Sequence, residues 1–304
     1  MSSNIKFRKP VINDIKNIKK FFENSNVYAC DYSAANIFLW SEINNIEIFY
    51  DEEVLYFRYL SGGEFYYAFP ITTKPITTKS IKNAIERLEK FSDENKFDLK
   101  YGIIEEEKFE IMEKIYPGKY KIEYARDYYD YVYLRENLVN LSGRKYHGKK
   151  NHINKFKKNY AKWSYEPITK NNIDECVEMV SVWCIENGCA EVESKLNEIQ
   201  VVMNAFKYFE ELDLTGGLLR AGNRIVAITM GEELNKDTFV VHFEKAFSNV
   251  QGAYPMINQQ FVLNELKEYK YVNREEDLGI EGLRKAKESY NPEFYVKKGI
   301  VKKV

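Results

Sequence analysis

Charged and amide side chains, which commonly bind ligands, are concentrated near the C-terminus in the segment VNREEDLGIEGLRKAKESYNP, residues 272–292. We predict a strand over residues 270–277, along which successive side chains point to opposite faces. One face would carry Asn273, Glu275 and Asp277, and the other would carry Arg274 and Glu276. Such alternating charge can hold a substrate that is itself charged.

A helix over residues 281–290 follows this strand in our prediction. Its apolar stripe would hide Leu283, Ala286 and Tyr290, with Arg284 and Lys287 one turn apart on a flank. Burying many ionic groups is costly unless they pair. Two interpretations therefore stay open for this segment: an ion-pair lattice that braces the strand against the helix, or a substrate site in which Arg274, Asp277, Arg284 and Lys287 position charged groups.

The apolar strand TFVVHFEKA, residues 238–246, carries two candidates for a general base. Alternation predicts that Val240, His242 and Glu244 share one face. A carboxylate at a strand end can accept a proton from an attacking amine, and histidine can do the same. A hydrogen-bonded structural role is the alternative for both side chains.

The sequence NVQGAYPMINQQF, residues 249–261, predicts a loop that leads into a helix. Free backbone N–H groups at a helix start suit a phosphate or similar anion, and a glycine allows its close approach. We therefore assign Gln251, Gly252 and Ala253 to carrier binding, with an ordinary capped turn as the alternative. Tyr254 and Asn258 on the same helix are assigned to the substrate.

The stretch GRKYHGKKNHINKFKKNYAK, residues 143–162, contains eight lysines and arginines and no acidic residue. A helix from about residue 145 would bury a stripe of Tyr146, Ile153, Phe156 and Tyr160. One-sided charge in an otherwise balanced chain favours a surface for RNA, coenzyme or lipid phosphates over a merely solvated helix. The residues assigned to carrier phosphates on this helix are His147, Lys149, Lys150, Asn151, Lys155 and Lys158.

These segments belong to two halves that share one order of elements. Residues 5–24 and 163–187 each read as a short strand, a proline turn and a helix, and a set of hairpins follows each. Helix, strand and helix then follow at 79–94, 97–104 and 106–115, and again at 254–268, 270–277 and 281–290. This order is the one used by the GNAT acyltransferase fold, so we expect an α/β protein with two tandem GNAT-like domains, 1–140 and 141–304.

Composition limits the class of protein. The 304 residues are 44% hydrophobic and carry a net charge of −1, which indicates packed cores and no global attraction for nucleic acid. We find no apolar run of about 18 residues and no signal-peptide core at the N-terminus, so we expect a cytoplasmic protein. The four cysteines lack metal-ligand spacing, so we expect no metal site.

The motifs GRKYHGKKNHINKF, HFEKA, GAYPMINQQF and VNREEDLGIEGLRKAKESYNP together resemble the family of the phosphatidylglycerol lysyltransferase C-terminal domain. That family is similar to the Fem-type aminoacyltransferases. Its late motif corresponds to Gly282, Leu283, Arg284, Lys287, Tyr290 and Pro292. The upstream Asn273–Asp277 segment departs from that motif and resembles soluble relatives instead.

The resemblance implies an acyl or aminoacyl transferase. The donor would be tRNA or coenzyme A, with no tightly bound cofactor, and the acceptor would be an amine or hydroxyl of a small molecule, peptide or lipid headgroup. Glu244 would be the base, and backbone N–H groups of strand 238–244 would polarise the carbonyl. The alternative is a non-catalytic module of the same fold that binds RNA or a small charged metabolite.

Overall fold

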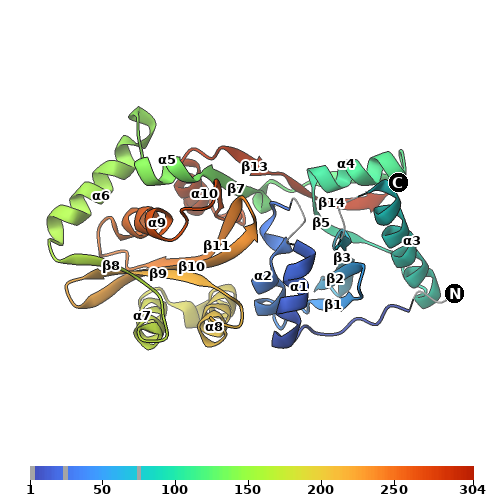
Figure 1. Ribbon diagram of the computed structural model, residues 1–304, viewed down its shortest axis with the longest axis horizontal. Helices are drawn as coiled ribbons and strands as arrows, with labels where there is room; N and C mark the ends of the chain where they lie inside the picture. The colour runs from blue at the N-terminus through green and yellow to red at the C-terminus, as the bar shows by residue number, and fades with distance from the viewer. Residues whose placement is uncertain (1–3, 23–26, 74–76) are drawn as a thin grey trace. The chain divides into compact units, whose positions relative to one another are not determined.

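The computed structural model describes residues 4–22, 27–73 and 77–304, which form two compact units (Figure 1). The first unit comprises Met1–Asp130, Glu276–Ile280 and Tyr295–Val304, and the second comprises Tyr131–Glu275 and Glu281–Phe294. This division differs from the predicted boundary at 140/141. The chain leaves the first unit at Asp130 and returns to it twice near the C-terminus.

The first unit contains a mixed sheet with strand order β1-β2-β3-β5-β14-β6, in which β4 also pairs with β2. The C-terminal strand β14 lies between β5 and β6 and is antiparallel to both. Our prediction gave no strand to this last segment. The strands are β1 (Glu47–Tyr50), β2 (Val54–Ser61), β3 (Glu64–Tyr67), β4 (Ile71–Thr72), β5 (Tyr101–Glu105), β6 (Tyr120–Tyr124) and β14 (Lys298–Lys303).

Local sequence signals explain several elements of the first unit. Ile15, Ile18 and Phe22 are buried on one stripe of α1, as their spacing predicts. The β2–β3 hairpin turns at Gly62 and Gly63, whose φ angles of 58° and 81° suit residues without a Cβ atom. The helices are η1 (Ile12–Asp14), α1 (Ile15–Phe22), η2 (Cys30–Tyr32), α2 (Ala34–Leu39), α3 (Thr78–Asn95), α4 (Glu106–Ile115) and η3 (Arg126–Tyr128).

The second unit contains a mixed sheet with strand order β13-β7-β12-β11-β10-β9-β8. The antiparallel strands β9, β10 and β11 form the centre of this sheet, and β12 pairs in parallel with β11. The strands are β7 (Asp130–Leu134), β8 (Trp163–Pro167), β9 (Thr215–Ala221), β10 (Arg224–Asn235), β11 (Thr238–Ala246), β12 (Tyr271–Asn273) and β13 (Phe294–Val296).

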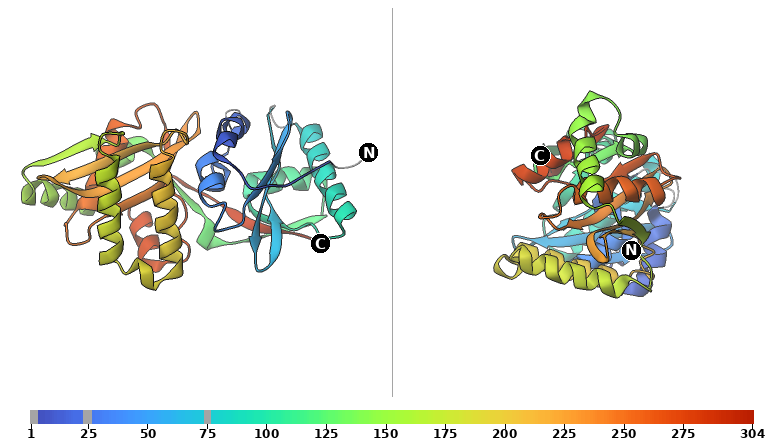
Figure 2. Two further views of the ribbon diagram at one scale, coloured as in Figure 1. Left: turned by 90° about the horizontal axis from the view of Figure 1, so that it is seen from below. Right: turned by 90° about the vertical axis from the view of Figure 1, so that its left-hand side faces the viewer.

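Helices cover both faces of this second sheet. The pair α7 and α8 lies side by side across one face (Figure 2, left), and α9 packs on the other face beneath α5 and α6 (Figure 1). α9 is buried on most sides because it lies between the sheet and these two helices. The helices are α5 (Arg135–Asn140), η4 (Arg144–Tyr146), α6 (His147–Asn159), α7 (Ile173–Glu186), η5 (Cys189–Glu191), α8 (Glu193–Lys207), α9 (Ala253–Asn264) and α10 (Glu281–Glu288).

The segment after β12 corrects two predictions. The strand expected over 270–277 ends at Asn273, and Glu275 and Leu278 adopt left-handed backbone conformations that interrupt an extended strand. In α10, Leu283 and Ala286 are exposed, whereas Lys287 is buried. The apolar stripe was therefore placed on the wrong face of this short helix, although Tyr290 just beyond it is buried as predicted.

Candidate active site

The parallel strands β11 and β12 run together over only three residues, from Thr238 to Val240 on β11. Beyond this point β11 continues to Ala246 while β12 has ended. Pairing with β10 skips His242, because Met230 pairs with Phe243 and Gly231 with Val241. This irregularity interrupts the simple alternation on which we placed Val240, His242 and Glu244 on one face. Such bulges often re-aim side chains beside functional sites.

Glu244 lies on the part of β11 beyond its pairing with β12. Its Oε1 accepts a hydrogen bond from Nη2 of Arg274 at 3.0 Å, and its Oε2 accepts one from Nδ2 of Asn258 at 3.2 Å. The Glu244 and Arg274 side chains are each only 12% exposed. Glu244, Asn258 and Arg274, three residues predicted separately, therefore meet at one point of the second unit.

Two tyrosines surround the Arg274 guanidinium. Its carbon lies 4.8 Å from the centre of the Tyr290 ring and 5.8 Å from that of Tyr133. Burial opposes the charged form, but the charge of Glu244 prevails and the pKa of Arg274 is raised. Its Nη1 is buried and has no hydrogen-bond partner among the residues described. Tyr133 was not predicted, since a tyrosine in a strand gives no signal of a site.

Lys149 reaches the same place from α6. Its Nζ lies 4.0 Å from the centre of the Tyr290 ring, on a side chain that is half-buried. Burial and the charge of Arg274 together lower the pKa of Lys149 to about 8, although the charge of Glu244 opposes the shift. Lys149, Glu244, Asn258, Arg274 and Tyr290 make up what we call the Glu244 site.

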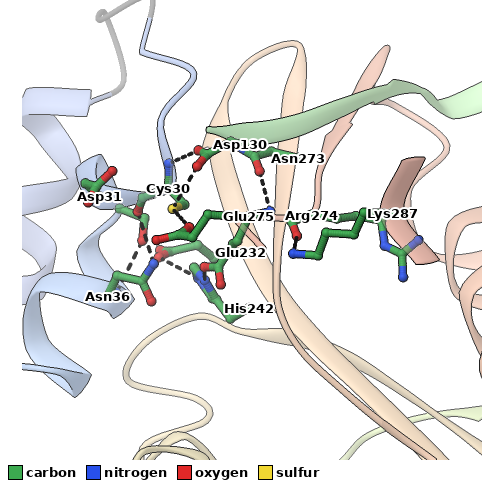
Figure 3. Close-up of polar contacts among 12 residues, drawn as sticks. Cys30, Asp31, Asn36, Asp130, Glu232, His242, Asn273, Arg274, Glu275 and Lys287 are labelled. Carbon is green, nitrogen blue, oxygen red and sulfur yellow. Dashed lines mark hydrogen bonds and ion pairs between the residues drawn. The ribbon is translucent and has the colours of Figure 1, made fainter. Parts of the chain in front are cut away.

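His242 is placed differently from Glu244. Its Nδ1 lies 2.9 Å from Oε1 of Glu275 and its Nε2 lies 3.2 Å from Oε1 of Glu232 (Figure 3). Burial alone would lower the pKa of His242, but hydrogen bonds to the two carboxylates raise it to about 9. An imidazolium whose two nitrogens both face carboxylates is poorly suited to accept a proton at neutral pH.

The charged segment after β12 is held mainly by bonds to the backbone. The Glu275 N–H donates to Oδ1 of Asn273 at 2.6 Å, and the Lys287 ammonium donates to the carbonyl of Arg274 at 2.5 Å (Figure 3). Tyr133 in turn donates its hydroxyl to the carbonyl of Lys287 at 2.8 Å. Asn273 and Lys287, assigned above to substrate, are therefore buried parts of the frame that carries Arg274.

Asp277 belongs to the first unit, whereas Arg284 belongs to the second. The Asp277 side chain is fully buried, with Arg126 at 3.2 Å and the Gly279 N–H at 2.9 Å from its carboxylate. For Asp277 these contacts favour the ion-pair interpretation of the segment. Arg284 is half-buried on α10.

The loop before α9 is packed tightly against α6. Gly252 has a φ angle of 86°, and a Cβ atom there would lie 2.3 Å from the carbonyl oxygen of His152. Ala253 is buried and donates its N–H to the carbonyl of Val250, while Gln251 and Tyr254 are exposed. The α6 backbone therefore fills the space beside Gly252.

The predicted polar face of α6 is open to solvent. The buried stripe contains Tyr146, Ile153 and Phe156, with Tyr160 half-buried beyond the helix end. The prediction of an amphipathic helix is thus confirmed. The exposed residues that we assigned to carrier phosphates are His147, Lys150, Asn151, Lys155 and Lys158.

The first unit holds a cluster of the buried Cys30 and Asp130 with the half-buried Glu276, whose ligand-type atoms all lie within 4.8 Å of one another. The Lys298 ammonium lies 2.7 Å from Asp130 and 3.7 Å from the Cys30 sulfur. Burial and the nearby carboxylates raise the pKa of the Cys30 thiol. The Lys298 ammonium thus supplies positive charge to this cluster.

No helix in the described parts of the chain is long and apolar enough to cross a membrane.

Comparisons with known proteins show which family the chain resembles. A structure of a conserved protein of unknown function from Bacteroides thetaiotaomicron is 35% identical, with 98% of this chain and 99% of that chain covered and a TM-score of 0.89. L-PGS from Bacillus licheniformis is 12% identical, with 95% and 91% covered and a TM-score of 0.64. FemX is 7% identical, with 97% and 96% covered and a TM-score of 0.59.

An uncharacterised protein of Mycoplasmoides gallisepticum is 22% identical over 189 residues, and that match spans 61% of this chain and 60% of the other protein. The prediction of an α/β protein with two tandem GNAT-like domains is confirmed, as is the resemblance to Fem-type proteins in fold. The family model described as phosphatidylglycerol lysyltransferase, C-terminal, matches residues 22–301. The chain therefore belongs to the phosphatidylglycerol lysyltransferase C-terminal family.

Proposed function

We propose that this chain transfers an aminoacyl group from aminoacyl-tRNA to a hydroxyl or amine acceptor, with the Glu244 site as its active site. The observation that carries the proposal is the buried pair of Glu244 and Arg274, set where β11 has separated from β12. Membership of the phosphatidylglycerol lysyltransferase C-terminal family supports a transfer reaction of this class.

Arg274 supplies the electrostatic part of the reaction. Attack on an ester carbonyl places negative charge on its oxygen, and donors already fixed in place stabilise that charge best. Nη2 of Arg274 is held by Glu244, while Nη1 has no hydrogen-bond partner among the described residues. Glu244, which itself accepts a hydrogen bond from Asn258, fixes the guanidinium, and Nη1 stabilises the negative charge that develops on the carbonyl oxygen.

The basic face of α6 supports tRNA as the donor. His147, Lys150, Lys155 and Lys158 are exposed on it without an acidic residue on the helix. Such a surface binds a phosphate backbone through charge and counterion release. Coenzyme A is the weaker candidate, because the carbonyl oxygen of His152 crowds Gly252 in the loop that would meet its pyrophosphate.

We propose the acceptor as a chemical class, a hydroxyl or an amine. An attacking hydroxyl or amine has to reach the carbonyl carbon beside Arg274. The family description names phosphatidylglycerol, so the glycerol hydroxyls of its headgroup are the first acceptor to test. Small amines and peptides follow as further acceptors.

A transfer assay tests the proposal. Bacterial tRNA charged with a mixture of labelled amino acids is incubated with the protein and phosphatidylglycerol vesicles, small amines or peptides. Label is then counted on tRNA, in the lipid extract and in the aqueous product. We expect acceptor-dependent movement of label, reduced about 100- to 1000-fold in Arg274→Lys by loss of an oriented oxyanion donor.

Glu175→Gln is the matched control variant, since Glu175 forms an exposed ion pair with Arg220 on the same unit. A parallel arm uses labelled acetyl-coenzyme A as the donor. If the folded protein moves no label from tRNA, the proposal is wrong; label moving only from the coenzyme would identify the other donor. Binding of tRNA without any transfer would identify a non-catalytic RNA-binding module.

A further inference from the structure

Lys149 differs from the other lysines of α6. Lys150, Lys155, Lys157 and Lys158 are exposed, whereas Lys149 is half-buried. Its Nζ lies over the Tyr290 ring, and it forms no ion pair with any residue that the structure describes. Of the five lysines on α6, Lys149 is the one that is partly buried. Partial burial without a direct ion pair disfavours the charged ammonium form.

The charged and titratable groups around the Lys149 ammonium come from three elements. They are Glu244 on β11, Arg274 just after β12 and Tyr290 just after α10. Glu244 is already bonded to Arg274 and Asn258, so it neutralises Arg274 rather than Lys149. Burial and, to a smaller extent, the Arg274 charge lower the pKa of Lys149 to about 8. About one-tenth of these side chains are therefore neutral amines at pH 7, and about half are neutral at pH 8.

We propose that Lys149, and not Glu244, is the general base that takes the proton from the attacking acceptor. The inference rests on the proposed transfer function and assigns a further catalytic residue to it. Glu244 is a poor base in this arrangement, because protonating it would leave the Arg274 guanidinium buried without its counter-charge. A lysine whose pKa lies near the working pH meets the requirement for efficient proton transfer.

The step balances without any further reactant. The neutral Lys149 amine accepts the proton of the acceptor O–H or N–H while that oxygen or nitrogen bonds to the ester carbonyl carbon. The carbonyl π electrons move to oxygen, where Arg274 Nη1 stabilises the negative charge. Collapse of this intermediate breaks the bond to the tRNA ribose oxygen, which takes the proton from the Lys149 ammonium. The products are the aminoacylated acceptor and free tRNA.

Lys207 provides a matched control for the aromatic contact. Its Nζ lies 4.8 Å from the Tyr208 ring centre, but its side chain is exposed on α8. Competitive acetylation of the full chain with trace acetic anhydride, read by peptide mass spectrometry across pH 6.5–11, gives the titration of each lysine. We expect Lys149 to reach half-maximal labelling at about pH 8 and at lower pH than Lys207.

The same inference predicts the behaviour of the transfer reaction. The rate, corrected for spontaneous ester hydrolysis, should rise about tenfold per pH unit below pH 8 and level off above it. Lys149→Arg keeps the charge but cannot release its proton, so transfer should fall by at least about 100-fold. Lys207→Arg should keep the wild-type rate. Methylamine should partly restore transfer by Lys149→Ala, because it supplies a free amine base.

Two results would overturn the inference while leaving the transfer function intact. One is a Lys149→Arg variant that retains the wild-type rate, which would reduce Lys149 to a positive charge. The other is labelling of Lys149 at the same pH as Lys207. Absence of transfer by the wild-type protein in every donor and acceptor arm is a different result, since it refutes the proposed function and removes the step in which Lys149 would act.

Discussion

Raising the pH towards 9 should destabilise the second unit, because His242 is expected to be an imidazolium in the folded state. Its ring nitrogens lie 2.9 Å from Glu275 and 3.2 Å from Glu232, and the histidine side chain is fully buried. In the unfolded chain the same group has a pKa of about 6.5. Below that pH the stabilisation is fully present, and it is lost as the pH rises through the folded pKa of about 9.

The magnitude follows from the shift. About 2.5 pKa units at 1.36 kcal/mol per unit give ~3 kcal/mol of unfolding free energy lost between about pH 6.5 and 9. Urea unfolding at a series of pH values in this window measures the loss. In His242→Gln this contribution to the pH dependence should be absent and the stability at pH 6.5 lower, because the buried Glu232 then loses the imidazolium beside it.

Imidazole NMR provides the direct test of this reasoning. The chain has three histidines, and the other two, His147 and His152, are exposed. The resonance that disappears in His242→Gln is assigned to His242, and His152→Gln serves as the control. A His242 resonance that titrates near pH 6.5 would show that the two carboxylates do not raise the pKa of His242. His242 would then again be a candidate for the general base.

Two further predictions test the frame of the site by thermal unfolding. Asp277→Asn should lower the free energy of unfolding by about 1–3 kcal/mol, since it removes the charge that Arg126 faces. Glu281→Gln, at an exposed position, is the control and should leave stability unchanged. If Asp277→Asn melts at the same temperature as the wild-type protein, the buried ion pair is contradicted. Gly252→Ala should destabilise by at least about 1–3 kcal/mol, because its φ angle is 86° and the added Cβ would lie 2.3 Å from the α6 backbone. Gly282→Ala on α10, where nothing lies within 4 Å of an added Cβ, is the matched control, and a harmless Gly252→Ala would show that the loop is looser than described.

Elements with strong local signals were predictable from the sequence. The β2–β3 turn at Gly62 and Gly63, the helix of residues 106–115 and the long hairpin of 215–246 all follow from periodicity and turn chemistry between near neighbours. The strand β14 was not predictable in the same way. It pairs Lys298 with Glu105, and a strand partner nearly two hundred residues away leaves no local pattern.

Several residues of the Glu244 site could be predicted from the sequence, but the contacts between them could not. Glu244 and Arg274 were both singled out, yet they are 30 positions apart and only the fold shows that they pair. The period-2 argument failed beyond Asn273, because a positive φ at Glu275 ends the alternation that the argument assumes. Glu275 therefore turns to His242, a partner that no spacing in the sequence indicates.

The α/β class, the repeated order of elements and the amphipathic basic helix could all be predicted from the sequence, because each depends on side chains close together along the chain. Which charges are neutralised depends on contacts between residues far apart in the sequence, and these contacts exist in the folded chain alone. Lys149 and Lys150 are neighbours of the same type, but one lies over Tyr290 and the other is exposed. Their chemistry differs because burial and nearby charges, not residue type, set the free energy of holding a proton.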